Sequence, residues 1–493
     1  MQQLIQIHPK DNVAVATAEI AADVKVLGIT SREPIPFGHK LALRGVAAGE
    51  AVVKYGYPIG RAKRDIAAGE WVHTHNLATA LDETPVYRYK ETTQVDVPSA
   101  APLTFLGYEN ADGSAGIRNE IWILPTVGCV NKTAERLCSE ANRRFASLPG
   151  ESVTFAAFPH PYGCSQMGED ETNTQKLLAA LACHPNAAGV LLLSLGCENN
   201  NLSAFLPFLG DYDPARVKTL VTQDSPDEIA EGMALLEELA VRASRRTRVP
   251  IAAGRLVVGY KCGGSDAFSG ITANPLCGRL TELLRLQGAR AILTEVPEMF
   301  GAETVLMQRA VSREVFDEIV NMVEEFKAYY LRNGQVVYEN PSPGNKAGGI
   351  TTLEEKSLGC IQKGGTVPVT AVLDYAKPCE SAGLNLLTGP GNDIVSCTNL
   401  TASGAHLILF TTGRGTPLGA PVPTLKISTN SALAQKKPGW IDFDAGEVLT
   451  GGSLDGAAQD LLAQVLSVAS GQSCKNEKNG YREIAIFKNG VTL

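Results

Sequence analysis

The sequence predicts an α/β protein in which a small all-β module at the N-terminus precedes two α/β domains with mostly parallel sheets. Three observations support this fold class. Residues 1–98 consist of turns that feed short strands, residues 99–248 alternate short apolar strands with helical segments, and residues 249–493 repeat that alternation. A chain of 493 residues is also longer than one hydrophobic core accommodates, so these three segments are the predicted domains.

The composition indicates small-molecule chemistry. The net charge of −8 is spread over the chain without a basic tract, so neither a nucleic-acid surface nor an anionic-membrane surface is expected. No apolar run approaches the roughly 18 residues of a membrane span, and the N-terminus lacks the basic and apolar regions of a leader. Eleven cysteines form an odd set without a CxxC pair, so reduced thiols and a cytoplasmic location are predicted.

The N-terminal module contains an internal repeat. The segment 45–56 (GVAAGEAVVKYG) aligns with the segment 65–76 (DIAAGEWVHTHN), in which two ordinary strand residues are replaced by His73 and His75. Residues at positions i and i+2 of a strand share a face. The two imidazoles are therefore predicted to converge on a metal ion or a substrate, with a surface pair of strand histidines as the alternative.

The two following segments show a helical period between short apolar runs. Amphipathic helices are predicted at residues 132–145, 172–183, 227–245 and 313–332. Strands such as IWILPTV, GVLLLSL and HLILFTT lie between helical segments, as in parallel sheets covered by helices.

Polar side chains gather where the predicted strands end. Parallel sheets bind ligands at the carboxyl ends of their strands, so this edge is the expected location of a site. Neither the GxxxxGK[ST] nor the GxGxxG spacing is present, so nucleotide binding is poorly supported. The polar clusters are TVGCVN, HPYGCSQ, GCENN, KCGGSD, TEVPE, TGPGND and TTGRGT.

Three of these clusters contain a cysteine that follows one of three successive strands, namely Cys129, Cys164 and Cys197. A shared iron–sulfur cluster is geometrically possible for such an arrangement. The spacing is not diagnostic, because small thiols are also common core residues. Both interpretations stay open at this stage.

The segment 338–365, YENPSPGNKAGGITTLEEKSLGCIQKGG, combines glycines, amides, hydroxyls, carboxylates and lysines with almost no apolar periodicity. A loop of this length inside a compact domain is uncommon unless it is functional or disordered. We interpret it as a glycine-rich active-site loop of the third domain, with a flexible connector as the alternative.

These motifs, together with GIRNEIWILPTVGCVN, KCGGSDAFSGITANP and LTEVPEMFGAE, resemble the altronate and galactarate dehydratase family along the whole chain. The resemblance implies an SAF-type β-clip domain at residues 1–98 and a sugar-acid hydro-lyase. The implied reaction converts D-altronate to 2-dehydro-3-deoxy-D-gluconate and water in hexuronate catabolism, with galactarate or another sugar acid as the alternative substrate. The implied cofactor is Fe2+, with Mn2+ as a substitute. The three-cysteine cluster, inferred above from the residues, stays the alternative. A homodimer is also expected.

Such a reaction removes the C2 proton, stabilises an enediolate and protonates the departing C3 hydroxyl. A divalent metal would stabilise the enediolate as a Lewis acid. We expect His73 and His75 to bind the metal or transfer the proton, because imidazole suits iron and titrates near neutrality. Glu198 and Asp266, with Glu295 as a further candidate, are predicted to complete the metal shell, although salt-bridged carboxylates are the ordinary explanation for isolated acids.

The base is predicted to be Lys261, Lys346 or a histidine, and a lysine base requires burial or a neighbouring cation to lower its pKa. A second set of polar side chains is predicted to bind the substrate carboxylate and hydroxyls, with the stitching of loops as the alternative role. This set contains Asn199, Asn200, Ser265, Asn274, Asn345, Thr351 and Arg414. A non-catalytic protein that binds sugar acids on the same fold is the alternative function.

Overall fold

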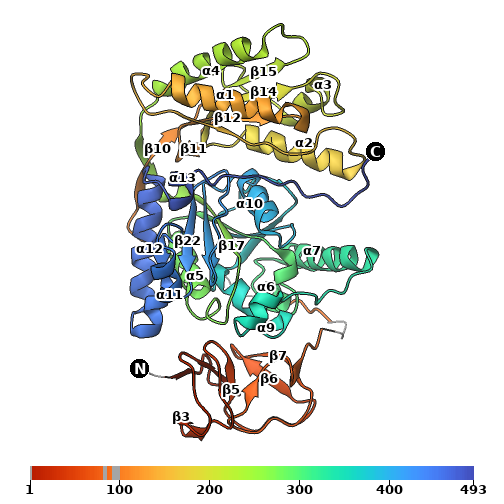
Figure 1. The fold of residues 1–493 in the computed structure, drawn as a ribbon, viewed down its shortest axis with the longest axis vertical. Helices are drawn as coiled ribbons and strands as arrows, with labels where there is room; N and C mark the ends of the chain where they lie inside the picture. Colours follow the sequence, from red (N-terminus) through yellow and green to blue (C-terminus); the bar gives the residue numbers. More distant parts are fainter. Residues whose placement is uncertain (1–2, 82–85, 92–99) are drawn as a thin grey trace.

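The structure, a computed structural model, describes residues 3–81, 86–91 and 100–493 as three domains along the long axis of the molecule (Figure 1). The N-terminal domain lies at one end, the C-terminal domain occupies the middle and the second domain lies at the other end. No helix among these residues has the length and apolar character that crossing a membrane requires.

The N-terminal domain consists of short antiparallel strands joined by tight turns. Its two AAGE turns share one geometry, because Glu50 accepts a hydrogen bond from the Ala47 N–H at 3.0 Å and Glu70 accepts one from the Ala67 N–H at 2.6 Å. The predicted repeat is therefore present in the fold. The strands are β1 (Leu4–Ile5), β2 (Val13–Ala16), β3 (Lys25–Val26), β4 (Ile29–Thr30), β5 (Lys40–Ala42), β6 (Ala51–Lys54), β7 (Tyr57–Ala62), β8 (Trp71–Val72) and β9 (Leu77–Ala78), which form the sheets β1-β2-β5-β8, β6-β7-β9 and β3-β4.

The second domain is built on a parallel sheet of four strands. Its elements are β12 (Glu120–Pro125), α1 (Asn131–Arg144), β13 (Thr154–Ala157), α2 (Glu169–Ala182), β14 (Ala187–Ser194), α3 (Leu202–Phe205), β15 (Val217–Val221) and α4 (Glu228–Ser244), with the strand order β13-β12-β14-β15. Helices α1 and α4 pack on one face, where Leu137 and Leu239 belong to one hydrophobic cluster. Helix α2 contributes Leu177 and Leu181 to a different cluster that continues into the C-terminal domain.

The C-terminal domain contains a parallel sheet of seven strands in the order β19-β20-β18-β17-β21-β22-β23. The strands are β17 (Val257–Cys262), β18 (Arg290–Leu293), β19 (Val369–Leu373), β20 (Gly383–Leu387), β21 (Leu407–Thr412), β22 (Thr424–Ser428) and β23 (Phe443–Asp444). The helices are α5 (Ala273–Leu286), α6 (Glu303–Met307), α7 (Arg313–Arg332), α8 (Pro343–Ala347), α9 (Leu353–Cys360), α10 (Asp393–Ala402), α11 (Ser431–Lys436), α12 (Leu454–Ala469) and α13 (Lys475–Lys478).

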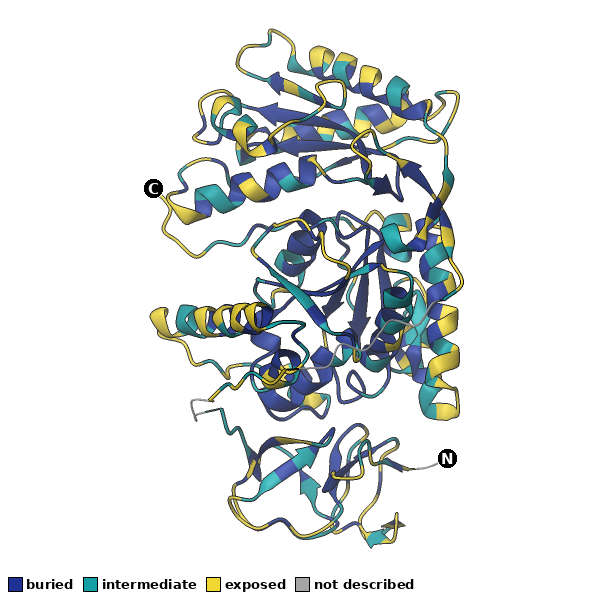
Figure 2. Ribbon diagram, turned by 180° about the vertical axis from the view of Figure 1, so that it is seen from behind, coloured by how far each residue is buried: buried dark blue, intermediate teal, exposed yellow. Residues whose placement is uncertain are grey.

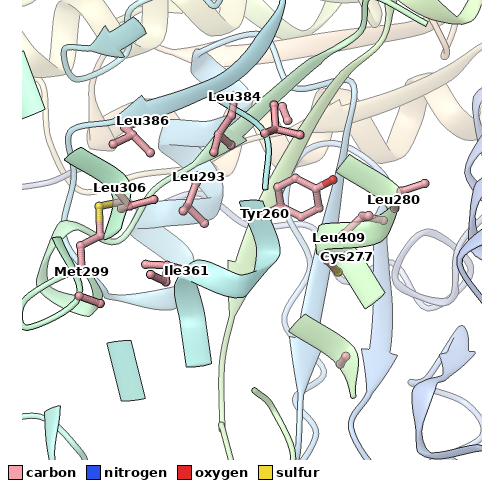
Figure 3. Packing of buried hydrophobic residues seen from close by; sticks show 14 of the residues in the cluster. Tyr260, Cys277, Leu280, Leu293, Met299, Leu306, Ile361, Leu384, Leu386 and Leu409 are labelled. Atoms are coloured by element: carbon pink, nitrogen blue, oxygen red, sulfur yellow. The ribbon is translucent and has the colours of Figure 1, made fainter. Parts of the chain in front are cut away.

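The central strands of both parallel sheets are buried, whereas α7 exposes one side to solvent (Figure 2). The core of the C-terminal domain is formed by side chains of β17, β18, β20 and β21 packed against α5 and the turn 361–364 (Figure 3). Burial on both faces explains why these strands have continuous apolar runs instead of alternating ones.

The second and C-terminal domains share a continuous hydrophobic cluster, in which Trp122 and Leu192 of one domain join Ile408 and Phe410 of the other. A small antiparallel sheet spans the same boundary, because β10 (Thr104–Glu109) pairs with both β11 (Ala115–Gly116) and β16 (Val249–Ala252). These contacts join the two domains through apolar surface and backbone hydrogen bonds.

The N-terminal domain is held to the C-terminal domain by buried charges. Glu355 of α9 lies 2.8 Å from the Nζ atoms of both Lys40 and Lys54, and all three side chains are at most 1% exposed. Lys40 Nζ also donates to the Gly349 carbonyl at 2.7 Å. A buried charge without a partner is costly, so this triad defines how the two domains meet.

Most predicted helices are confirmed. The predicted helix 313–332 has the bounds of α7, and the predicted helix 132–145 differs from α1 by one residue at each end. Helix α2 begins three residues before the predicted position 172, because Gly168 with a φ of 60° precedes a first turn that contains three acidic residues.

The segment 338–365 is helical over much of its length, which corrects the prediction of a glycine-rich loop. Ser342 caps α8 in a capping box, Thr352 caps α9, and a 3-10 turn covers residues 361–364. Every residue of α9 is buried. Glu355 and Lys356 pair with opposite charges, and Glu354 accepts hydrogen bonds from Thr79 and Ala80. The helix therefore lacks the apolar stripe from which sequence analysis recognises a surface helix.

Replacing Glu355 with Gln should lower the free energy of unfolding by about 3–5 kcal/mol, because two buried lysines lose their counter-charge. Urea denaturation of the full chain measures this loss. The exposed carboxylate Glu50, which pairs with Arg44, offers the matched control, and Glu50→Gln should change stability little. Equal effects of the two substitutions would contradict a dominant role for the buried triad.

Candidate active site at the carboxyl edge of the seven-stranded sheet

A pocket of about 380 Å³ lies where the strand order changes direction. The chain passes from β17 to β18 on one side and reaches β21 on the other side only later, so the crevice between β17 and β21 is a topological switch point. Asp266 follows β17, and Arg414 follows β21. The pocket is lined by Phe37, Gly38, Asp266, Phe268, Ala347, Gly348, Gly413, Arg414, Asn430, Ala432, Leu433 and Lys436, so the N-terminal domain, α8 and α11 complete its walls.

Asp266 shapes the pocket and does not bind a metal in this arrangement. One carboxylate oxygen accepts hydrogen bonds from the N–H groups of Phe268 and Ser269, and the other accepts from Thr429 Oγ1 at 2.9 Å and Asn430 Nδ2 at 3.2 Å. Burial raises the pKa of this carboxyl. Because its oxygens already accept from protein donors, the predicted metal-ligand role of Asp266 is not supported.

Arg414 is exposed at the pocket, and its guanidinium donates to the Gly344 carbonyl at 3.0 Å. Lys346, on the same helix as Gly344, is half-buried. A guanidinium in this position matches the planar geometry of a carboxylate. The predicted carboxylate-binding role of Arg414 is therefore compatible with the fold.

A buried cluster of charged and thiol side chains lies at the ends of β17 and β18. Lys261 contacts Glu295 and lies 3.0 Å from Asp393. Glu298 pairs with Lys356 of α9 at 2.8 Å and accepts a hydrogen bond from Cys360 Sγ at 2.8 Å. The buried members of the cluster are Lys261, Cys262, Glu295, Glu298, Lys356, Cys360 and Lys363, and the partly exposed Asp393 lies at its border.

Mutual interactions within this cluster spread its pKa values widely. A hydrogen bond from Cys360, with the charge of Lys363, lowers the pKa of Cys262 to about 5 against the effect of burial. Burial and the charge of Glu298 raise the pKa of Glu295 to about 8. Burial acts to raise the pKa of Glu298, but the neighbouring lysines outweigh it and lower that pKa to about 2. Widely separated pKa values in one buried group are typical of functional sites.

One group in this cluster has the compactness that a single metal ion requires. Sγ of Cys262, a carboxylate oxygen of Glu298 and Sγ of Cys360 lie within 4.8 Å of one another, and all three residues are buried. Among the residues that the structure describes, no other set of three or more His, Cys, Asp or Glu side chains is this compact. The predicted set of His73, His75, Glu198 and Asp266 is therefore not assembled into one metal shell.

His73 and His75 do not share a strand face, which corrects the prediction. Strand β8 ends at Val72, and residues 73–76 form a turn in which Asn76 Oδ1 accepts from the His73 N–H at 2.9 Å. His75 lies exposed in this turn. The Asn76 side chain caps this turn and so ends the strand at Val72. The internal repeat did not reveal this local hydrogen bond.

His73 instead joins a cluster of rings near the pocket. Its ring stacks on Trp71 at 5.4 Å and lies 4.8 Å from the ring of His39, whose Nε2 is 3.4 Å from the Ala347 carbonyl. Burial, with the charges of Lys40 and His39, lowers the pKa of His73 to about 4, so this imidazole is neutral near pH 7. Its buried Nδ1 has no hydrogen-bond partner among the described residues.

Four predicted binding residues of the C-terminal domain are buried around the pocket and the cluster, where they make hydrogen bonds within the protein. Ser265 Oγ lies 2.7 Å from Cys262 Sγ, Asn345 Nδ2 donates to the Ser265 carbonyl at 2.8 Å, Asn274 Nδ2 donates to the Gly359 carbonyl at 2.9 Å, and Thr351 Oγ1 donates to Glu355 at 2.5 Å. These contacts support the loops, and the substrate-binding role of the four residues stays a prediction.

The remaining predicted residues lie in the second domain. Glu198 accepts hydrogen bonds from Thr126 Oγ1 and Ser194 Oγ at 2.6 Å each, and from two backbone N–H groups. Asn199 and Asn200 hydrogen-bond to neighbouring loops of the same domain. These residues hold together the strand ends of the second sheet and are not part of the pocket beside Arg414.

The sequence analysis missed several residues of the site. Cys262, Glu298 and Cys360 belong to motifs that were recognised, but no pattern indicated that they meet. His39 and Glu355 had no signal of their own, because a single histidine or glutamate is common and their partners are distant in the chain.

Three family models match consecutive parts of the chain. They describe the altronate/galactarate dehydratase SAF domain at residues 2–80, the second domain of D-galactarate dehydratase/altronate hydrolase at 107–244 and the C-terminal domain of D-galactarate/altronate dehydratase at 253–492. The chain belongs to the altronate/galactarate dehydratase family. The N-terminal domain is thus its SAF domain, as the resemblance implied.

The relatives that align with almost the whole chain include enzymes named for two different substrates. The altronate dehydratases of Bacillus subtilis (strain 168) and Escherichia coli (strain K12) are each 47% identical to this chain, and the alignments cover 100% of both partners. The galactarate dehydratase (L-threo-forming) of Escherichia coli (strain K12) is 32% identical, over 98% of this chain and 96% of its own. This family member is thus more similar to the two altronate enzymes than to the galactarate enzyme.

The contact between the SAF domain and α9 should weaken in acid. Burial acts to raise the pKa of Glu355, but Lys40 and Lys54 outweigh it and hold that pKa well below its ordinary value. A carboxyl whose folded-state pKa is lower than its unfolded value of about 4.3 adds stability above that value, and this contribution is lost as the pH falls below it. The urea midpoint should therefore fall more steeply below pH 4.3 for the native chain than for Glu355→Gln, and parallel pH profiles would contradict the assignment.

Proposed function

We propose that this protein dehydrates D-altronate to 2-dehydro-3-deoxy-D-gluconate and water. One observation carries the proposal. The chain is 47% identical to two altronate dehydratases over 100% of both sequences, compared with 32% identity to a galactarate dehydratase. The pocket at the switch point supports it, because a volume of 380 Å³ lies within the range of small-molecule sites and accommodates a six-carbon acid.

The substrate carboxylate is placed at Arg414 in this proposal. The guanidinium lies at the carboxyl end of β21, where a bidentate contact with a carboxylate is geometrically natural. Lys436 lines the same pocket and offers donors to the hydroxyl chain, whereas the Asn430 amide already donates to Asp266 and to the Gly413 carbonyl.

Lys261 is excluded as the base on physical grounds. Burial acts to lower its pKa, but Glu295 and Asp393 outweigh that effect and hold the pKa well above its ordinary value. Its Nζ also donates to the carbonyls of Cys262 and Gly391. A lysine held as a cation does not accept a proton near neutral pH.

We assign proton acceptance from C2 to His73. The support for this assignment is geometric, because the buried Nδ1 of His73 lacks a hydrogen-bond partner among the described residues. Burial lowers the pKa of His73 to about 4, which keeps the imidazole neutral and also makes it a weaker base than an ordinary histidine. His73 lies beside His39, whose Nε2 is 3.4 Å from the carbonyl oxygen of Ala347, a residue of the pocket wall.

Ferrous iron, with manganese as the substitute, is the proposed metal. The donor set of Cys262, Glu298 and Cys360 is the group that could hold such an ion, because its atoms are mutually close and buried. The Glu298 carboxylate suits either ion, whereas two thiols favour softer metals than manganese. The pKa of Cys262 is lowered, but the hydrogen bond with Cys262 and burial raise the pKa of Cys360 well above its ordinary value, so binding of a metal ion would displace the Cys360 proton. When bound, the ion would supply Lewis-acid stabilisation of the enediolate.

Two further properties belong to the proposal. All eleven cysteines are free thiols in the structure, the state expected in a reducing compartment, which supports a cytoplasmic location. A homodimer stays a prediction, and light scattering that detects only monomer would contradict that prediction.

The purified protein should release a 2-keto-3-deoxy acid from D-altronate faster than from galactarate, D-mannonate or D-gluconate. The assay uses anaerobically prepared protein with ferrous iron, manganese or a chelator. Preferred turnover of galactarate would reassign the substrate within the family. Binding of altronate without turnover by folded, metal-loaded protein would instead favour a non-catalytic sugar-acid-binding role.

Cys360→Ser should lower the affinity for ferrous iron by at least about 10-fold and reduce turnover in proportion, because a thiol ligand is lost. The measurement is the bound iron of each protein, determined together with its acid-labile sulfide, so that iron without sulfide can be counted separately. Cys277→Ser is the matched control, since Cys277 is also a buried thiol of the C-terminal domain but lies outside the metal group. If His73→Ala loses iron while Cys360→Ser keeps it, the metal belongs with the imidazoles.

A further inference from the structure

The second domain carries a Gly-Cys pair at the carboxyl end of each of three adjacent strands. Cys129, Cys164 and Cys197 follow β12, β13 and β14, and each is preceded by a glycine in the sequence. The strand order β13-β12-β14 makes these three strands neighbours, and they run parallel in matching register. Their carboxyl ends therefore meet at one edge of the sheet, about 4.8 Å apart from strand to strand.

The three loops that hold these cysteines contact one another directly. The Gly128 N–H donates to the Tyr162 carbonyl at 2.9 Å, and the Asn200 N–H donates to the Gly163 carbonyl at 3.0 Å. Asn199 Oδ1 accepts from the Ser165 N–H at 3.1 Å and lies 3.5 Å from Cys164 Sγ. The loop after β13 is thus joined to both of its neighbours within two residues of each cysteine.

The glycines are required by this packing. A Cβ at Gly163 would overlap the Thr126 carbonyl oxygen, and a Cβ at Gly128 would lie 2.9 Å from the His160 carbonyl oxygen. Ser165, directly after Cys164, adopts a φ of 61°, a strained conformation for a residue with a side chain. Backbone strain of this kind persists where the surroundings hold it in place, often at functional sites.

All three thiols are exposed, although free cysteine is among the residue types most often buried. Buried Asn200 has an Oδ1 atom without a hydrogen-bond partner among the described residues, although its Nδ2 donates to the Thr126 carbonyl. Apolar packing does not explain three exposed thiols held together on tightly packed glycine loops. A metal cluster bound by all three thiolates would explain this arrangement.

We propose that Cys129, Cys164 and Cys197 hold an iron–sulfur cluster of the [4Fe–4S] type in the second domain. A mononuclear ion is disfavoured, because these three sulfur atoms do not form a group within 4.8 Å, the compactness that the Cys262 group has. A cubane suits wider spacing, since each thiolate binds a different iron. Three cysteines leave the fourth iron open to water or to a carboxylate or hydroxyl oxygen.

This site is separate from the iron proposed at Cys262, Glu298 and Cys360, which lies at the edge of the other parallel sheet. The cluster does not rest on the proposed reaction, because sulfide content and spectra report on it without turnover. A chain that dehydrates altronate without sulfide would overturn the cluster alone. A chain that carries sulfide without turning over altronate would overturn the reaction alone.

The test compares the native chain with Cys129→Ser, Cys164→Ser, Cys197→Ser and Cys183→Ser. Cys183 is the matched control, since it is also an exposed cysteine of the second domain but lies at the end of α2. Each protein is purified anaerobically, treated with ferrous iron and sulfide, desalted and analysed for iron, acid-labile sulfide, visible absorbance and the electron paramagnetic resonance signal after reduction.

The native chain and Cys183→Ser are expected to retain about four sulfides per chain with a broad absorbance near 400 nm. Each of the three other variants should lose most of the sulfide while circular dichroism and the urea midpoint remain close to native. A folded native chain without sulfide after this treatment, or with iron but no sulfide, overturns the proposal. Equal sulfide in all four variants overturns the assignment of the ligands.

Discussion

The rest of the site depends on the buried ion pairs that the Glu355 carboxylate forms with two lysines. This carboxylate lies on α9 between Lys40 and Lys54 of the SAF domain, and none of the three side chains has a route to water. Because each charge would be costly without the others, the SAF domain meets the C-terminal domain in one orientation. That orientation brings Phe37 and Gly38 to the pocket and places His39 against Ala347.

Helix α9 joins the SAF domain to the buried cluster, because different side chains of the helix contact each of them. Its acidic residues Glu354 and Glu355 contact the SAF domain, through hydrogen bonds to Thr79 and Ala80 in the first case and through the lysine pairs in the second. Lys356 and Cys360 contact Glu298 behind the pocket. A displacement of the SAF domain would therefore reach the buried cluster through a single helix.

The two parallel sheets use their carboxyl edges for different chemistry. In the C-terminal domain the strands end in buried charges whose pKa values are spread from about 2 for Glu298 to about 8 for Glu295. In the second domain the strands end in exposed thiols on tightly packed glycine loops. We propose proton and metal chemistry at the first edge and thiolate ligation at the second.

Much of this organisation could be read from the sequence, because it depends on local patterns. The βα rhythm, the bounds of helices such as α7, and the polar clusters at strand ends all follow from periodicity and turn residues. Even the importance of the segment 338–365 was visible in its unusual composition. Its helical structure was hidden, since α9 is buried on all sides and carries no apolar stripe.

The sequence by itself determined the family, the three-part order of β and α/β segments, and the edge of each sheet where polar groups gather. Only the tertiary structure decided which of these groups meet: Glu355 contacts Lys40 across 315 positions, and Cys360 contacts Glu298 across 62. It also separated Glu198 and Asn199 from the pocket, and it moved His73 from a strand into a turn beside His39. Such pairings are set by domain docking and by the burial of charge, and neither leaves a periodic signal along the chain.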